Sequence, residues 1–107
     1  IDDMLFNFNK YDIKKSNIKL LDRLAELIND NKDYNIKILG HTDNFGDDIY
    51  NLNLSEKRAK AIYDEMIKRG VNSERLIFKG MGESQPIFSN NSEENRSKNR
   101  RVEIIFE

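Results

Sequence analysis

The sequence predicts an α+β fold, close to an α/β one, for a single domain that spans residues 1–107. Two segments carry apolar residues at helical spacing, short apolar runs alternate with polar stretches, and both helical segments lie between two such runs. The predicted order is therefore β-α-β-α-β-β. Because strands that flank a helix need crossover connections, we expect a mixed sheet with the two main helices packed on one face.

The N-terminal elements are a strand, a helix and a second strand. Residues 4–8 form a short apolar run that ends in a polar loop at 9–12. Ser16 or Asn17 can cap the first helix, in which apolar residues recur at helical spacing. These apolar residues are Ile18, Leu21, Leu24, Ala25 and Ile28, with Leu20 and Leu27 at the margin. Residues 35–40 are predicted to form the second strand, with alternate side chains on one face.

A polar loop and a second long helix follow. Residues 41–53 lack periodicity and are long for a plain connector, so we predict a binding loop there. The helix is expected to begin near Leu54, with Ser55 in a capping role. It is expected to end at Arg69, because Gly70 supplies a C-terminal stop.

The C-terminal part is predicted to contain two strands. Residues 75–79 form the first of them, and Gly80 and Gly82 then mark a bulge or a tight turn. The two glycines are not a dinucleotide fingerprint, because the third glycine and a long following helix are missing. Ser92 can cap a short helical turn. Residues 101–106 form the last strand, with apolar side chains on one face.

Composition excludes several classes of function. With 18 basic and 19 acidic residues, the chain has no bulk charge that would attract nucleic acid or an anionic membrane. The lack of cysteine excludes disulfides, thiolate metal sites and cysteine nucleophiles. No apolar run approaches the length of a membrane span. Because the chain starts at Ile1 without an initiator Met, we expect it to be an excised piece of a longer protein.

Asp43 and Arg58 are the candidate binding residues. Asp43 comes just beyond the second predicted strand, where sheets of this kind tend to place ligand contacts. Arg58 shares a helix face with Leu54 and Ile62. One loop joins the two elements, so the carboxylate and the guanidinium can approach each other and hold a small zwitterion. Spacing alone leaves open a turn aspartate, a snorkelling arginine or an internal salt bridge.

Metal and catalytic sites are not predicted. His41 is the only histidine, so it has no second histidine or cysteine to share a zinc ion and no partner set for catalysis. We expect a structural, hydrogen-bonded imidazole. Residues 43–48 superficially match a calcium loop, but Phe45 occupies the third ligand position and no glutamate stands at the twelfth. No cofactor is predicted either.

Several motifs in order resemble the OmpA-like peptidoglycan-binding domain. That family includes the C-terminal domain of OmpA-type outer-membrane proteins, the peptidoglycan-associated lipoprotein and the flagellar stator protein. The resemblance covers almost the whole chain. Its motifs are Phe6-x-Phe8-x-Lys10-Tyr11-Asp12-Ile13, Gly40-His41-Thr42-Asp43 with Gly46, Asn51-x-x-Leu54-Ser55-x-x-Arg58-Ala59, Gly80-x-Gly82-Glu83-x-x-Pro86 and Asn99-Arg100-Arg101-Val102-Glu103.

The resemblance implies a binding domain that is not an enzyme. Its ligand would be the stem peptide of peptidoglycan, held non-covalently through its diamino acid, usually meso-diaminopimelate. Asp43 would accept hydrogen bonds from the ligand's ammonium, and Arg58 would pair with its carboxylate. The other residues implied at the pocket are Thr42, Asn51, Leu54, Asp12, Phe45 and Asn99. The sequence does not decide between diaminopimelate and an analogue such as lanthionine.

Two alternatives belong to other functional classes. A wall-cleaving hydrolase could use Asp12, Asp43 or Glu83 as paired carboxylates, but no nucleophile–base set is visible. A module that binds other envelope proteins is compatible with wall binding. The resemblance implies a periplasmic domain that a preceding segment tethers to the outer membrane, whether that segment is a barrel, a lipoprotein anchor or a motor helix. It also predicts that, without ligand, Asp43 and Arg58 are open to solvent or occupied by a stray ion, and not closed into a salt bridge.

Overall fold

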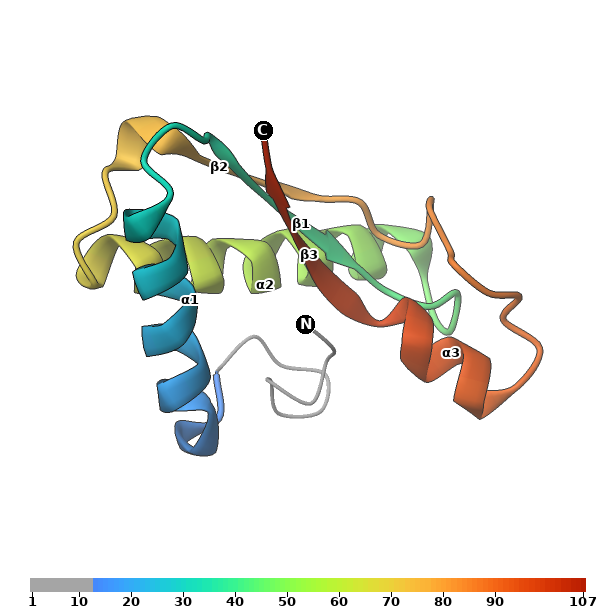
Figure 1. The fold of residues 1–107 in the computed structure, drawn as a ribbon. Coiled ribbons are helices and arrows are strands. Elements are labelled where there is room, and N and C mark those ends of the chain that lie inside the picture. Colours follow the sequence, from blue (N-terminus) through green and yellow to red (C-terminus); the bar gives the residue numbers. More distant parts are fainter. Residues whose placement is uncertain (1–12) are drawn as a thin grey trace.

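The computed structural model describes residues 13–107 (Figure 1). Its elements are the 3-10 helix η2 (Lys15–Asn17), α1 (Ile18–Asp30), β1 (Ile36–His41), α2 (Asp48–Lys68), the 3-10 helix η3 (Ser73–Arg75), β2 (Leu76–Gly80), α3 (Glu93–Asn99) and β3 (Arg101–Phe106). The predicted strand at 4–8 and the candidate residue Asp12 lie outside the described residues.

The described strands form a mixed sheet in the order β2-β1-β3, which confirms the predicted α+β fold. β1 pairs in parallel with β2 and antiparallel with β3. In this register Gly40 lies opposite both Gly80 and Val102, and His41 lies opposite Arg101. The end of β1 and the start of β3 therefore meet at one edge of the sheet, next to α3 (Figure 1). This edge positions the candidate site.

Both long helices pack against the same side of the sheet. The inward side chains Ile36 and Ile38 of β1 are at most 1% exposed. Together with β1, each helix contributes to one hydrophobic cluster, whose helical members are Leu21, Ala25, Ile28, Ala59, Ile62 and Met66. On the opposite face, Ile77 and Lys79 are exposed. The predicted arrangement of helices on one face is confirmed.

The predicted start of the second long helix is wrong, because α2 begins at Asp48 and not near Leu54. The Asp47 carboxylate caps it by accepting hydrogen bonds from the backbone N–H groups of Ile49 and Tyr50 at 2.8 and 3.2 Å. A cap of this kind satisfies donors that have no partner within the helix. The buried positions of the first turns are polar, as at Asn51, so an apolar stripe did not reveal them.

Two glycines let α2 lie directly on the strand ends. A Cβ atom at Gly40 would stand 2.1 Å from the Ser55 carbonyl oxygen, and one at Gly80 would stand 2.4 Å from the Glu56 nitrogen. Ser55 is inside the helix and is not its cap, in contrast to the prediction. Its hydroxyl donates to the Leu52 carbonyl at 2.8 Å and accepts from the Gly82 N–H at 2.9 Å. The helix backbone is thus fixed against the sheet where the candidate residues begin.

The turn after β2 and the short helix before β3 were both predicted. Gly82 has a φ of +55°, a conformation that favours glycine. Its carbonyl accepts from the Thr42 N–H at 2.8 Å, which ties the turn to the chain after β1. Ser92 caps α3 through a 3.1 Å hydrogen bond from the Asn95 N–H. The helix continues beyond the predicted single turn, as far as Asn99.

Candidate ligand-binding site

Asp43 and Arg58 lie at the end of β1 and on the sheet-facing side of α2. Their exposed fractions are 6% and 5%, so the expectation of a solvent-open pair is wrong. Asn51 connects the two elements. It shares this buried face of α2 with Arg58, and its amide donates to the carbonyl oxygen of Asp43 at 3.3 Å.

The Asp43 carboxylate has a different partner on each oxygen. Oδ1 accepts from the Phe45 N–H at 2.9 Å, and Oδ2 forms a 2.7 Å ion pair with Nη1 of Arg100. The first contact is the turn hydrogen bond that the sequence left open as an alternative. The second brings in an arginine from 57 positions further along the chain. Asp43 is therefore a turn residue and an ion-pair partner at once.

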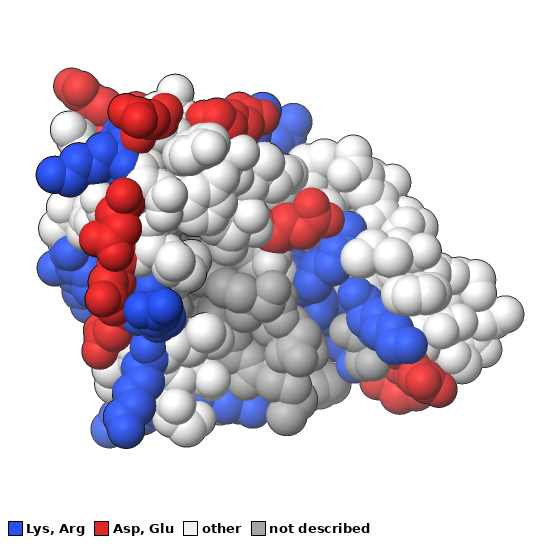
Figure 2. Space-filling view, viewed as in Figure 1, with Lys and Arg blue, Asp and Glu red and all other residues white. Residues whose placement is uncertain are grey.

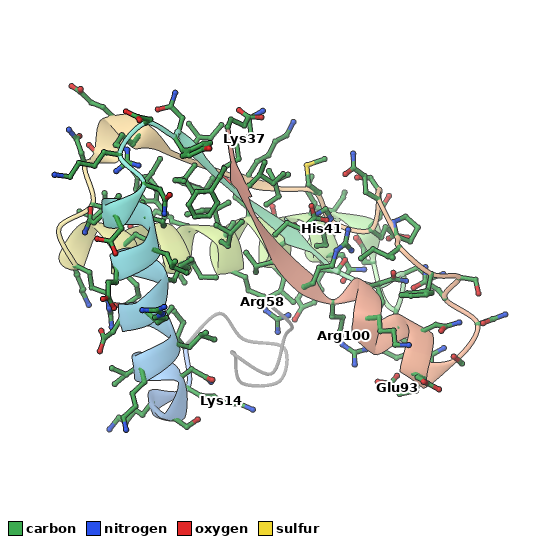
Figure 3. The ribbon with its side chains drawn as sticks, in the orientation of Figure 1. Lys14, Lys37, His41, Arg58, Glu93 and Arg100 are labelled. Carbon is green, nitrogen blue, oxygen red and sulfur yellow. The ribbon has the colours of Figure 1, made fainter. Side chains whose placement is uncertain are left out.

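The sequence singled out Arg100 only as part of the motif Asn99-Arg100-Arg101-Val102-Glu103, and the structure places it at the site. It follows α3 directly, and its Nη2 forms a second ion pair, at 2.7 Å, with Oε1 of Glu93 (Figure 3). This arginine lowers the pKa of the Glu93 carboxyl, with a smaller contribution from Arg96. A signal was available, because an antiparallel last strand begins at the edge where the central strand ends.

Thr42 and Asn51, two predicted pocket residues, shape the loop around Asp43. Both side chains are buried. The Thr42 hydroxyl donates to the Asp43 carbonyl oxygen at 2.9 Å, and the Asn51 amide also donates to the Phe45 carbonyl oxygen at 3.1 Å. Leu54 is half-buried on α2, whereas the Phe45 side chain is 78% exposed and projects from the loop.

Asn99, which the resemblance implies at the pocket, makes four hydrogen bonds to the loop that precedes α3. Its Oδ1 accepts from the N–H groups of Ile87 and Phe88 at 2.7 and 3.0 Å. Its Nδ2 donates to the Phe88 carbonyl oxygen and to Asn90 Oδ1 at 2.8 and 2.9 Å. These four bonds use the ordinary capacity of an amide. The fully buried Asn99 therefore holds the preceding loop and fixes the backbone next to Arg100.

His41 is buried at the same edge but on the outer face of the sheet. Its Nε2 lies 3.1 Å from Glu103 Oε1, yet neither ring nitrogen forms a hydrogen bond with the described residues, in contrast to our expectation. Burial lowers the pKa of His41, Arg101 lowers it further, and Glu103 opposes both effects. Burial thus disfavours the charged form of this imidazole, which is packed into the end of β1.

The described residues offer no group of three or more histidine, cysteine or acidic side chains that could hold a metal ion. In the calcium-like loop, Asp43 is taken up by Phe45 and Arg100, and Asp47 caps α2. Over 13–107, no helix combines the length and the apolar character that a membrane crossing needs. Figure 2 shows basic and acidic side chains interspersed on the viewed face.

Comparison with known proteins finds relatives among outer membrane proteins. The model of the OmpA family matches residues 5–100. The chain is 40% identical over 113 aligned residues to outer membrane protein A of Citrobacter freundii, an alignment that covers 95% of the chain and 48% of the relative. The Salmonella typhi protein of that name is 46% identical over 90 residues, which cover 82% of the chain and 26% of the relative. The chain thus spans at most about half of these curated relatives.

Solved structures agree on the fold. The C-terminal domain of Helicobacter pylori MotB superposes with a TM-score of 0.87 at 33% identity, covering 100% of this chain and 84% of that one. A MotB-like protein of Desulfovibrio vulgaris gives 0.91 at 29% identity, with 100% and 72% coverage. The peptidoglycan-associated lipoprotein of Burkholderia pseudomallei gives 0.86 at 27% identity, with 96% and 87% coverage.

Proposed function

The chain belongs to the OmpA family, a family known for peptidoglycan binding, and from this premise we propose that it binds the diamino acid of the peptidoglycan stem peptide. Domains of the OmpA, peptidoglycan-associated lipoprotein and MotB type are non-enzymatic binding domains. The observation that carries the proposal is the burial of Asp43 and Arg58 at one sheet edge, within the motifs of the family. We propose meso-diaminopimelate, or an analogue such as lanthionine, as the ligand.

Opposite charges at the site match the ligand's unlinked end. That end carries one ammonium and one carboxylate on the same carbon. We assign the ammonium to Asp43 and the carboxylate to Arg58, with a bidentate pairing available to the guanidinium. A lysine side chain offers no carboxylate, so it could not form the pairing with Arg58. Such mismatches cost several kcal/mol, roughly, which favours the zwitterion.

In this proposal, several predicted pocket residues support the two binding residues Asp43 and Arg58. Thr42 and Asn51 hold the loop that carries Asp43, as their hydrogen bonds to its carbonyl oxygen support. Leu54 and Phe45 would contact the apolar part of the ligand. We place the domain in the periplasm, where it would anchor the outer membrane or an envelope protein to the cell wall, because its relatives are envelope proteins.

Calorimetry with a diaminopimelate-containing muropeptide tests the proposal. We expect Asp43→Asn and Arg58→Gln each to weaken binding by more than about 30-fold, because each leaves a ligand charge without its buried partner. Arg58→Lys keeps the charge but not the planar fork, so its loss should be smaller. Lys79→Ala, on the exposed outer face, is the matched control and should bind normally. Unchanged affinity in both Asp43→Asn and Arg58→Gln would overturn the site assignment.

A further inference from the structure

The side chain of Arg100 stands where the ammonium of the proposed ligand would have to bind. Its Nη1 lies 2.7 Å from Asp43 Oδ2, the oxygen that the Phe45 turn leaves available. We propose that Arg100 competes with the ligand's ammonium for Asp43, and thereby sets both the affinity and the dependence of binding on that ammonium. This inference rests on the proposed function and adds a residue that tunes it.

The Asp43 carboxylate is held in one orientation and cannot rotate away from Arg100. Its Oδ1 is tied to the Phe45 N–H, and the Asn51 amide donates to the carbonyl oxygens of Asp43 and Phe45 on either side of the turn. The carboxylate is therefore presented in one orientation, with a side chain that is only 9% exposed. An incoming ammonium that binds Oδ2 has to share it with the guanidinium or displace the guanidinium.

When the ammonium displaces Arg100 from Asp43, the guanidinium can stay paired with Glu93. Its Nη2 is already paired with Glu93 Oε1 at 2.7 Å, and the Glu93 side chain is 68% exposed at the start of α3. The Arg100 side chain is itself 24% exposed, so its head group can move toward solvent. Its backbone stays fixed, because the four hydrogen bonds of Asn99 hold the adjoining loop. Exchange thus needs only a side-chain movement.

The exchange makes binding selective for a particular charge pattern. A ligand with an ammonium replaces one cation by another at Asp43, so no buried charge is left unpaired. A ligand without an ammonium leaves the Asp43–Arg100 pair in place and gains only the contact with Arg58. Removing Arg100 should therefore help the first kind of ligand and leave the second kind unaffected.

Two variants with opposite expected effects test the role by calorimetry. The probes are a diaminopimelate muropeptide and the same muropeptide with its free amine acetylated. Arg100→Gln should bind the first probe about fivefold more tightly, the size of a partly exposed ion pair, and the acetylated probe as the wild type does. Glu93→Gln removes the alternative partner, so it should bind the first probe about twofold more weakly. Arg100→Lys keeps a competing cation and should resemble the wild type.

The outcomes separate this role from the proposed function. If the wild type binds the muropeptide but Arg100→Gln binds it equally or more weakly, Arg100 is not a competitor and only this inference is overturned. If the wild type does not bind, or if Arg58→Gln and Asp43→Asn both bind as tightly as the wild type, the proposed function fails. The role of Arg100 then fails with it. Thermal unfolding of each variant checks that the fold is intact.

Discussion

The two sides of the candidate site are built by different means. On the α2 side, backbone packs on backbone, because Gly40 and Gly80 leave no room for a side chain between helix and strands. On the α3 side, side chains do the holding, through the amide of Asn99 and the ion pairs of Arg100. The α2 side is therefore fixed by steric contacts, whereas on the α3 side the charged ends of the side chains can move. A ligand site with one rigid wall can tolerate exchange of partners at the other.

The rigid side should show the largest effect on stability. In Gly40→Ala, the new Cβ would collide with the Ser55 carbonyl, so α2 must move away from the sheet. We expect a loss of about 3 kcal/mol in the free energy of unfolding, at the upper end for overpacking. Urea unfolding measures it. Gly46→Ala is the control, since nothing lies within 4 Å but its φ is +90°, and it should lose about 1 kcal/mol. Equal losses would contradict the steric account.

The adjustable side should be weakened most by Asn99→Ala. This change leaves the Ile87 and Phe88 N–H groups without their acceptor, and we expect a loss of about 2 kcal/mol in stability. Asn99→Asp keeps the acceptor oxygen and should lose less. Urea unfolding gives the stability, and muropeptide calorimetry should show slightly tighter binding in Asn99→Ala, because a loosened Arg100 competes less well for Asp43. Full stability in Asn99→Ala would show that the amide does not hold the loop.

A smaller effect is expected at the start of α2. Asp47→Ala removes the carboxylate that accepts from Ile49 and Tyr50, and it should cost about 1 kcal/mol in urea unfolding. The neighbouring Asp48→Ala removes an acidic residue of the first turn without removing the cap, so it should cost about half as much or less. If Asp48→Ala proved the more damaging change, the assignment of the cap would be wrong.

The smallest expected effect is a pH dependence of the stability that comes from His41, at the end of β1. Burial lowers the pKa of this imidazole in the folded state, so the unfolded chain takes up the proton first. Stability is then full above the ordinary pKa of 6.5 and declines as the pH falls below it. His41→Gln should show a flatter decline. Urea midpoints of both proteins at pH 7.5 and pH 5.5 provide the comparison, and parallel declines would contradict it.

The described helices and strands were largely predictable, because their apolar positions repeat with a clear period. The start of α2 was missed since its first buried positions are polar, and a hydrophobic pattern carries no trace of them. The candidate pair Asp43 and Arg58 could be predicted from spacing and motif, because both residues lie within one short stretch of chain. The ion pair of Arg100 and the loop contacts of Asn99 join distant segments, so local spacing did not reveal them, although the predicted strand order could have brought Arg100 near Asp43.

The central place of β1 has a mechanical consequence. Asp43 stands two residues beyond a strand that is hydrogen-bonded to β2 on one side and to β3 on the other. A pulling force that enters at Asp43 and runs along β1 is shared in shear by both ladders, since their hydrogen bonds lie across the direction of pull. A strand with only one neighbour in the sheet would have to resist the force with a single ladder of hydrogen bonds. A ligand bound at Asp43 would therefore transmit a pulling force to both neighbours of β1.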